Sequence, residues 1–205
     1  LDRYEQRRVV EFFRDPHVFE HLEQDVLPRL FEATAERGRL RVWSVGCSSG
    51  EEVYSVAMLL IEQAKRQAAP PLLQIFGTDL HERSLEQARE GVYPGEIRAQ
   101  VSEERLARFF RRENDHFRIR RDVREQVVFA PHNVLRDPPF SRIDLILCRN
   151  LLIYLQREIQ DDLIALLHYA LVPDGLLLLG SSENIERSDL FITEDSDLGL
   201  YRKRN

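Results

Sequence analysis

Cysteine is scarce in this sequence, which has only Cys47 and Cys148 among its 205 residues. Each closes a predicted strand, where a small apolar side chain packs well, so we expect reduced thiols and no disulfide framework. The sequence also lacks a long apolar run and a visible signal peptide. We therefore expect no membrane insertion and a cytoplasmic location.

Positive charge is in deficit, with 29 Lys and Arg residues against 35 Asp and Glu residues and a formal net charge of −6. This balance argues against nucleic-acid binding. No Ser/His/Asp arrangement and no metal-ligand cluster is evident in the sequence. His17 and His21 are one helical turn apart but have no evident third ligand, so we expect no metal site.

Segments with the apolar pattern of strands alternate with segments of helical spacing along most of the chain. This alternation predicts an α/β fold with a mostly parallel sheet and helices on both faces. Strands are predicted at residues 40–45, 72–76, 127–130, 143–148 and 176–179, and a terminal hairpin at 191–192 and 199–202. Helices are predicted at residues 16–30, 50–64, 84–90 and 153–171, the first with Asp15 as its N-cap.

Residues 92–125 interrupt this alternation and are predicted to form a small insertion on the main sheet. A turn is expected at 93–95, and Ser102 is expected to cap a helix that runs to about Arg112. The stretch around Phe117 alternates apolar residues with arginines, which is typical of a half-exposed strand.

The chain is predicted to consist of an N-terminal linker with an amphipathic helix at residues 1–39 and a main domain at residues 40–205. It begins abruptly in a charged, helix-like stretch from Leu1 to Arg8. We therefore expect an excised fragment, and we count further domains of the same polypeptide among its candidate partners.

The most informative motif runs from Arg41 to Glu52. Its apolar stretch ends at Gly46, a loop of small residues follows, and a helix begins at Gly50, which is the arrangement of a nucleotide-binding βα unit. A helix N-terminus attracts anions, but Glu51 and Glu52 would repel a pyrophosphate. They favour a ligand with an ammonium group and no phosphate, as in S-adenosylmethionine. The alternative is an acidic first turn that merely complements the helix dipole.

Polar residues follow four successive predicted strands: Glu52, Asp79, Asn133 and Asn150. In a parallel sheet, ligands bind at the carboxyl ends of the strands. Asp79 ends its strand in a Gly-Thr-Asp turn and is well placed to accept both ribose hydroxyls, and Asn133 could read an adenine edge. Each residue alone is more often a cap or turn former, but the four together are a stronger signal of a nucleoside site.

Five segments carry a resemblance to a known family, in the family's order: residues 11–16, 46–55, 78–79, 148–155 and 180–184. The chain resembles the chemotaxis receptor methyltransferases (CheR type), which are S-adenosylmethionine-dependent protein-glutamate O-methyltransferases. The Phe-Phe-Arg and Cys-Arg-Asn…Ile-Tyr segments are specific to this family. The resemblance implies a Rossmann-like class I methyltransferase sheet, a terminal antiparallel hairpin and a small inserted β-subdomain.

The resemblance also implies S-adenosylmethionine as cofactor, S-adenosylhomocysteine as product, no metal, and roles for the matching residues. Arg14 and Tyr154 match the arginine and tyrosine that the family places at the reacting centre. From the residues alone, Arg14 could instead cap a helix or pair with a carboxylate, and Tyr154 could be a core aromatic. The expected cofactor-binding residues are Gly46, Glu52 (methionine amino group), Asp79 (ribose), Asn133 and Val134 (adenine), and Arg149 and Asn150 (remainder of the pocket).

Two departures from the family bear on activity. The family usually carries an Asn-x-Thr-x-Phe-Phe-Arg pattern, and this chain has Arg8 and Val10 at the asparagine and threonine positions. These residues cannot repeat the family's hydrogen bonds to the donor, which implies weaker affinity or lost activity. The basic helical domain that precedes the linker in the family, and helps hold an acidic receptor helix, is also missing from this chain.

Eight arginines lie between Arg105 and Arg124, where the family has a β-subdomain that in some members grips a pentapeptide at the receptor's C-terminus. The loop at residues 112–116 is short and lacks glycine, so we expect recognition without that pentapeptide. The alternative is a solvated charged face.

These observations predict methylation of glutamate side chains on the cytoplasmic helical region of a chemoreceptor-like signalling protein. The first alternative is a catalytically silent donor-binding module that acts through a partner, which Val10 favours. The second is a small-molecule methyltransferase, and the two family-specific segments count against it.

Overall fold

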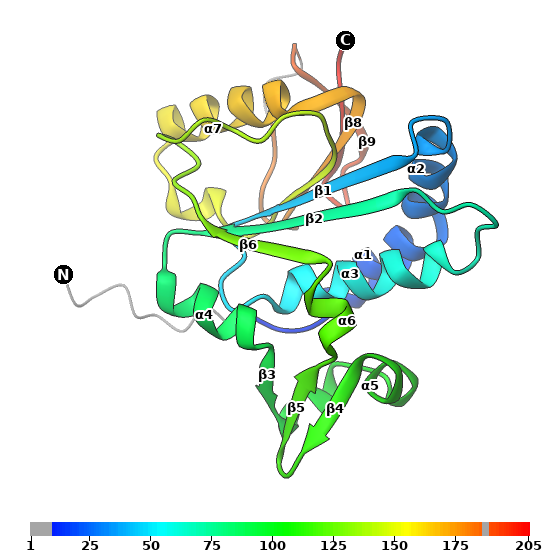
Figure 1. The fold of residues 1–205 in the computed structure, drawn as a ribbon. Coiled ribbons are helices and arrows are strands. Elements are labelled where there is room, and N and C mark those ends of the chain that lie inside the picture. Colours follow the sequence, from blue (N-terminus) through cyan, green and yellow to red (C-terminus); the bar gives the residue numbers. More distant parts are fainter. Residues whose placement is uncertain (1–9, 186–188) are drawn as a thin grey trace.

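A seven-stranded sheet is the main element of the computed structural model, which describes residues 10–185 and 189–205 (Figure 1). Its order is β6-β2-β1-β7-β8-β10-β9. The strands are β1 (Arg39–Val45), β2 (Leu72–Asp79), β6 (Val127–Pro131), β7 (Ile143–Cys148), β8 (Leu171–Leu179), β9 (Phe191–Asp195) and β10 (Leu200–Lys203). The first five run parallel and β10 is antiparallel to both of its neighbours, so the predicted parallel sheet and terminal hairpin are confirmed.

The order of the strands places a ligand-binding edge in the middle of the sheet. Strand β1 pairs with β2 on one side and with β7 on the other. The chain therefore leaves β1 at a topological switch point, and in open α/β sheets the crevice at that point is where ligands bind.

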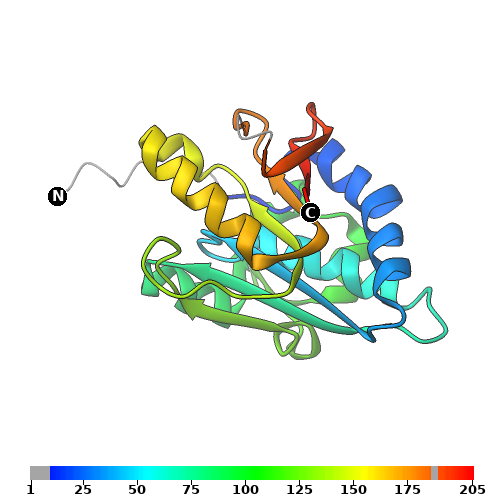
Figure 2. The same cartoon turned by 90° about the horizontal axis from the view of Figure 1, so that it is seen from above.

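Alternate side chains of the buried strands pack into two cores, one on each face of the sheet. Along β8, Leu176 and Leu178 belong to one core and Leu177 and Leu179 to the other, as the two-residue period of a strand requires. Figures 1 and 2 show helices on both faces. The first core is covered by α1 (Pro16–His21), the π-helical turn η1 (Leu22–Val26), α2 (Leu27–Thr34), α3 (Glu51–Ala64) and α4 (Glu82–Glu90), and the second by α7 (Arg157–Ala170).

The predicted start of the last long helix is wrong. The apolar spacing predicted a helix from Ile153, but α7 begins at Arg157. Residues Leu152–Tyr154 instead form a separate 3-10 turn, η3, and the backbone is extended at Leu155. The side-chain amide of Gln160 on α7 donates to the carbonyls of Leu152 and Leu155, both at 3.0 Å, and these bonds hold the turn apart from the helix.

The insertion forms a second, antiparallel sheet in the order β3-β5-β4, below the main sheet in Figure 1. Its elements are β3 (Val92–Pro94), η2 (Gly95–Ala99), α5 (Glu103–Phe109), β4 (Phe110–Glu113), β5 (His116–Ile119) and α6 (Arg121–Arg124). The turn predicted at 93–95 is wrong in part, because residues 92–94 pair with β5. The helix capped by Ser102 ends before Arg112, because the Phe110 ring packs edge-on against Phe12, with 5.6 Å between centroids, and strand pairing replaces the helix.

The N-terminal helix and the insertion contribute to the same core as the main sheet, through Phe19 and Ile119 among others. How the chain divides into domains stays a prediction. Cys47 and Cys148 are buried free thiols. Within the described ranges, no helix has the length and apolar character needed to cross a bilayer.

Candidate active site

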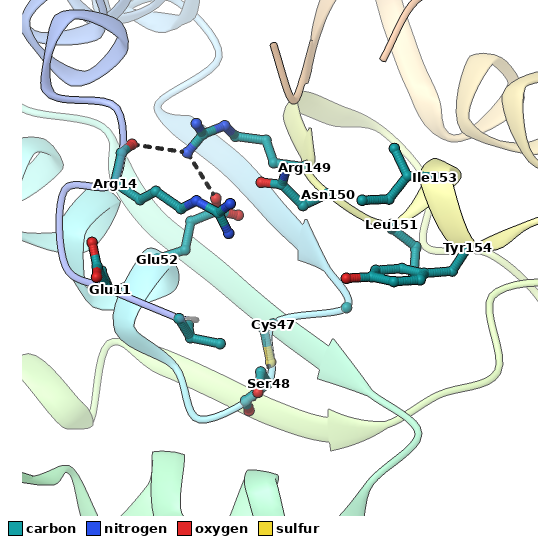
Figure 3. Close-up of a pocket in the computed structure, with 12 residues that line it drawn as sticks. Glu11, Arg14, Cys47, Ser48, Glu52, Arg149, Asn150, Leu151, Ile153 and Tyr154 are labelled. Atoms are coloured by element: carbon teal, nitrogen blue, oxygen red, sulfur yellow. Dashed lines mark hydrogen bonds and ion pairs between the residues drawn. The ribbon is translucent and has the colours of Figure 1, made fainter. Parts of the chain in front are cut away.

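Two adjoining cavities lie at the carboxyl ends of β1, β2 and β7. The larger has a volume of about 210 Å³ and the smaller about 110 Å³, and Gly46 and Leu151 line both of them. The larger cavity, shown in Figure 3, collects Arg14, Glu52, Arg149, Asn150 and Tyr154. The smaller collects Asp79, Asn133 and Val134. All nine sequence-predicted site residues therefore line one connected crevice.

The turn after β1 brings the backbone close to both cavities. Gly46 has a φ of 69° and Gly50 a φ of 92°, a region that favours glycine. A Cβ atom on Gly50 would lie 2.9 Å from the Ala88 Cβ, so no side chain fits there. The hydroxyl of Tyr93, a residue of the insertion, donates to the Ser49 carbonyl at 2.7 Å and so stabilises the turn after β1.

Glu52 and Glu51 have different roles, although the sequence predicted that both would face the ligand. Glu52 lines the larger cavity and accepts hydrogen bonds from Ser44 Oγ at 3.2 Å and Arg149 Nη1 at 3.1 Å. Burial raises the pKa of the Glu52 carboxyl, and the nearby Arg149 guanidinium partly offsets this rise. Glu51 instead accepts from the Ser49 hydroxyl at 2.7 Å and does not line either cavity.

Arg149 connects three parts of the site. Its side chain is 1% exposed and bonds Glu52 through Nη1 and Asp15 through Nη2, the latter at 2.5 Å. Its Nη1 also donates to the Arg14 carbonyl at 3.3 Å, as Figure 3 shows. Of the two carboxylates that bind Arg149, Glu52 is the one that lines the larger cavity, where it can meet an ammonium group. The predicted N-cap position of Asp15 is confirmed, with Pro16 following it in the first turn, but its carboxylate makes this ion pair and no side-chain capping bond.

Arg14 is held at the mouth of the larger cavity by an unusual backbone. Its neighbours Phe13 and Asp15 have φ values of 51° and 60°, in the left-handed region that few non-glycine residues adopt. The Ser55 hydroxyl accepts from the Phe13 N–H at 3.0 Å, and the Gln100 side chain accepts from the Phe12 N–H at 3.0 Å. Such backbone strain is typical of functional sites.

Tyr154 lies across the cavity from this segment, on η3. Its side chain is 58% exposed, so the interpretation of Tyr154 as a core aromatic is wrong. Its hydroxyl points into the cavity in Figure 3. Arg14 and Tyr154 thus approach the same space from elements that are far apart in the sequence.

Asp79 is the acidic group of the smaller cavity. The residue is 4% exposed, and its carboxylate accepts the Ser48 N–H at 2.9 Å and the His81 N–H at 3.0 Å, so its orientation is fixed before any ligand binds. Asn133 uses its side-chain oxygen to accept the Leu135 N–H at 3.1 Å, which is the turn-forming role that was the alternative for this residue.

Most of the remaining wall of the smaller cavity is apolar, contributed by Val45, Leu80, Val134, Leu135, Leu151 and Leu155, and Thr78, His81 and His132 complete it. An apolar slot with one oriented carboxylate suits a nucleoside, whose base is flat and whose ribose offers two hydroxyl donors.

The model for the CheR methyltransferase, SAM binding domain, family matches residues 8–199. The chain belongs to this family. It is 35% identical over 188 residues to the putative methyltransferase Cher3 of Pseudomonas putida, covering 88% of this chain and 66% of that protein. It is 34% identical over 179 residues to a chemotaxis protein methyltransferase of Borreliella burgdorferi, covering 85% of this chain and 63% of that protein.

A third relative is an uncharacterized 104.1 kDa protein of Rhodobacter capsulatus, 42% identical over 175 residues, of which this chain covers 18%. The chain thus spans about two thirds or less of the length of these relatives. Among solved structures, a TehB-like SAM-dependent methyltransferase from Corynebacterium glutamicum overlaps 93% of this chain and 94% of its own at 15% identity, with a TM-score of 0.47. That overlap is weak, and the family assignment rests on the sequence matches.

Membership in this family makes S-adenosylmethionine the cofactor and the fold that of a Rossmann-like class I methyltransferase. The residues fit this cofactor. The smaller cavity offers an apolar slot and the Asp79 carboxylate for adenosine, and the larger offers the Glu52 carboxylate for an ammonium group. The assignment of each residue to one part of the cofactor stays a prediction.

Sequence reasoning missed two residues that shape the crevice. Leu151 lines both cavities, but an apolar residue inside an apolar segment gives no signal of that place. Glu183 binds the backbone of the loop that carries Tyr154, and its only signal was membership in a segment that matches the family. In the described ranges, no three His, Cys, Asp or Glu residues are placed to hold a metal ion, and His21 lies 3.5 Å from Asp25 in an exposed pair.

Proposed function

We propose that this domain transfers a methyl group from S-adenosylmethionine to glutamate side chains on the cytoplasmic helical region of a chemoreceptor-like protein, forming methyl esters. One observation carries the proposal. Arg14 and Tyr154 line a cavity that also contains Glu52 and adjoins an apolar slot with the Asp79 carboxylate at its edge. The position of Arg14 supports a role in binding a substrate carboxylate beside a site suited to a cationic nucleoside.

The chemistry needs few catalytic groups. A glutamate carboxylate is already an anion and a competent nucleophile at pH 7, so no general base is required. When bound, S-adenosylmethionine supplies an electrophilic methyl group on a sulfonium centre. The protein has to align the carboxylate with that group and exclude water. The Arg14 guanidinium would grip the substrate carboxylate, and the Tyr154 hydroxyl would orient it.

Arg149 supports both the expected substrate-binding residue, Arg14, and the expected cofactor-binding residue, Glu52. Its guanidinium holds the Arg14 carbonyl and the Glu52 carboxylate at the same time. Glu52 would take the amino group of the cofactor and Asp79 its ribose, while Asn133 and Val134 would line the base. Gly46 and Asn150 would complete the pocket between them.

The insertion is the surface that we assign to the substrate. It carries nine arginines against seven acidic residues at positions 92–125, in a chain whose net charge is −6. The β4–β5 hairpin turns through Asn114 at a φ of 54°, with no glycine to allow close approach of a peptide backbone. An acidic receptor helix is therefore the partner that we infer, rather than a C-terminal pentapeptide.

A silent donor-binding module is the second candidate, because Val10 lines the larger cavity where the family has a threonine. The two candidates are separated by incubating the domain with methyl-labelled S-adenosylmethionine and the cytoplasmic region of a chemoreceptor from the same genome. Base-labile label on the receptor supports the enzyme. Binding of S-adenosylhomocysteine in a calorimeter without any transfer supports the silent module, and absence of both contradicts the proposed cofactor site.

A further inference from the structure

Glu183, in the loop after β8, is a buried carboxylate surrounded by backbone donors. Glu183 is 7% exposed. Oε2 accepts the N–H groups of Gly180 at 2.7 Å and Asn150 at 2.8 Å, and Oε1 accepts those of Leu152 at 2.7 Å and Ile153 at 3.4 Å. A buried carboxylate is stable only when such donors replace water, so this group is built into the fold.

These hydrogen bonds set the path of the loop that follows β7. Asn150 has a φ of 57°, a left-handed conformation that its backbone bond to Glu183 stabilises. Leu152 begins η3, and its N–H donates to Glu183 while its carbonyl accepts from the side-chain amide of Gln160 on α7. The loop is thus held on its donor side by Glu183 and on its acceptor side by Gln160.

The atoms around the Glu183 carboxylate are closely packed. A Cβ atom on Gly180 would lie 2.8 Å from Glu183 Oε2 and 3.0 Å from the Asn150 nitrogen. The loops after β7 and β8 therefore touch through the Glu183 carboxylate. Any change in its size or charge has to be absorbed by the backbone of one of them.

We propose that Glu183 is a positioning residue that fixes the 150–154 loop so that the Tyr154 hydroxyl stays directed into the larger cavity. The part concerning turnover rests on the proposed function, because it requires Tyr154 to act on the reacting groups. Figure 3 shows Asn150, Leu151 and Tyr154 along one wall of that cavity. A displacement of about 1 Å in such a group can cost about 100-fold in rate.

The test compares Glu183→Gln with Glu158→Gln, which removes the same charge from an exposed position on α7. The NH2 group of a glutamine side chain cannot accept hydrogen bonds, although its carbonyl oxygen can, so one of the two pairs of N–H donors loses its acceptor. In the Glu183→Gln variant, we expect the backbone amides of Asn150 and Leu152 to exchange their hydrogens at least about tenfold faster than in the wild type. We expect kcat to fall about 10- to 100-fold and the KM for the methyl donor to change only a few-fold. The Glu158→Gln control should match the wild type in all three.

A double-mutant comparison tells positioning from general destabilisation. In a Tyr154→Phe background, adding Glu183→Gln should reduce kcat by less than about threefold, because the group it positions is already gone. An equal reduction in both backgrounds, or loosened amides with unchanged kcat, would overturn the proposal. If Glu183→Gln does not fold, Gly180→Ala displaces the same carboxylate and takes its place in both experiments. If the wild type transfers no methyl group, the proposed function fails, and unchanged amide exchange in the variant would separately refute the hold of Glu183 on the loop.

Discussion

Replacement of Asp79 by alanine should weaken binding of S-adenosylhomocysteine, the methyl-transfer product, without unfolding the domain. The wild-type carboxylate is 4% exposed and already aligned by the Ser48 and His81 N–H groups. We propose that it contributes charged hydrogen bonds to the ribose hydroxyls, and its alignment removes the cost of ordering the side chain. Loss of such bonds costs about 1–3 kcal/mol, or roughly 5- to 150-fold in Kd.

Isothermal calorimetry with S-adenosylhomocysteine measures this loss directly. Urea unfolding of the same variant measures the separate cost of leaving two N–H donors without their acceptor, about 1–3 kcal/mol. Glu86→Ala is the matched control, because it removes a carboxylate from an exposed position on α4, the helix that follows Asp79 in the chain. Unchanged affinity in a folded Asp79→Ala variant would refute the assignment of the smaller cavity to adenosine.

Three further results are expected. Tyr154→Phe should keep product affinity within a few-fold and strongly depress methyl transfer, and equal rates for variant and wild type would remove Tyr154 from the reacting centre. Burial raises the pKa of the Glu52 carboxyl, so the affinity for S-adenosylhomocysteine should fall as the pH is lowered through that raised pKa and the carboxylate is neutralised. The Glu52→Gln variant should lose this pH dependence. A wild-type affinity that stays constant down to pH 4 would contradict the role of Glu52. The rate of receptor methylation should fall as the salt concentration rises and after charge reversal at Arg118 and Arg120, because exposed charges are screened beyond about 8 Å at physiological ionic strength. A rate that responds to neither change would place the substrate elsewhere. Tight binding of a receptor C-terminal pentapeptide would contradict the inference from the 112–116 loop.

The parallel sheet could be predicted because its central strands are buried on both faces. Ile143–Cys148 is entirely buried, and its apolar run has no competing interpretation. The turn at Gly46–Gly50 could be predicted for a similar reason, since glycine and small residues between an apolar strand and a helix fit few other structures. These local patterns agree with the tertiary structure, so sequence reasoning succeeded.

Errors occurred where long-range contacts decide the local structure. Helical spacing continues through Ile153 and Tyr154, but Gln160 and Glu183 bind this stretch from other elements and stop the helix until Arg157. Glu51 and Glu52 are equivalent in sequence, and only the place of Ser49 and Arg149 in the fold separates them. Glu183 and Arg149 lie far from their partners in the chain, and no local pattern reports these contacts.

Methyl esters on receptor glutamates, which we propose as the product of this domain, can be detected by mass spectrometry. The cytoplasmic helical region of a chemoreceptor from the same genome is incubated with S-adenosylmethionine and the wild-type domain, then digested and mapped. We predict one or more glutamate side chains heavier by one methyl group, lost after mild base, and absent when Arg14→Ala replaces the wild type. A receptor without methylated glutamates, after incubation with a domain that binds S-adenosylhomocysteine, would contradict the claim.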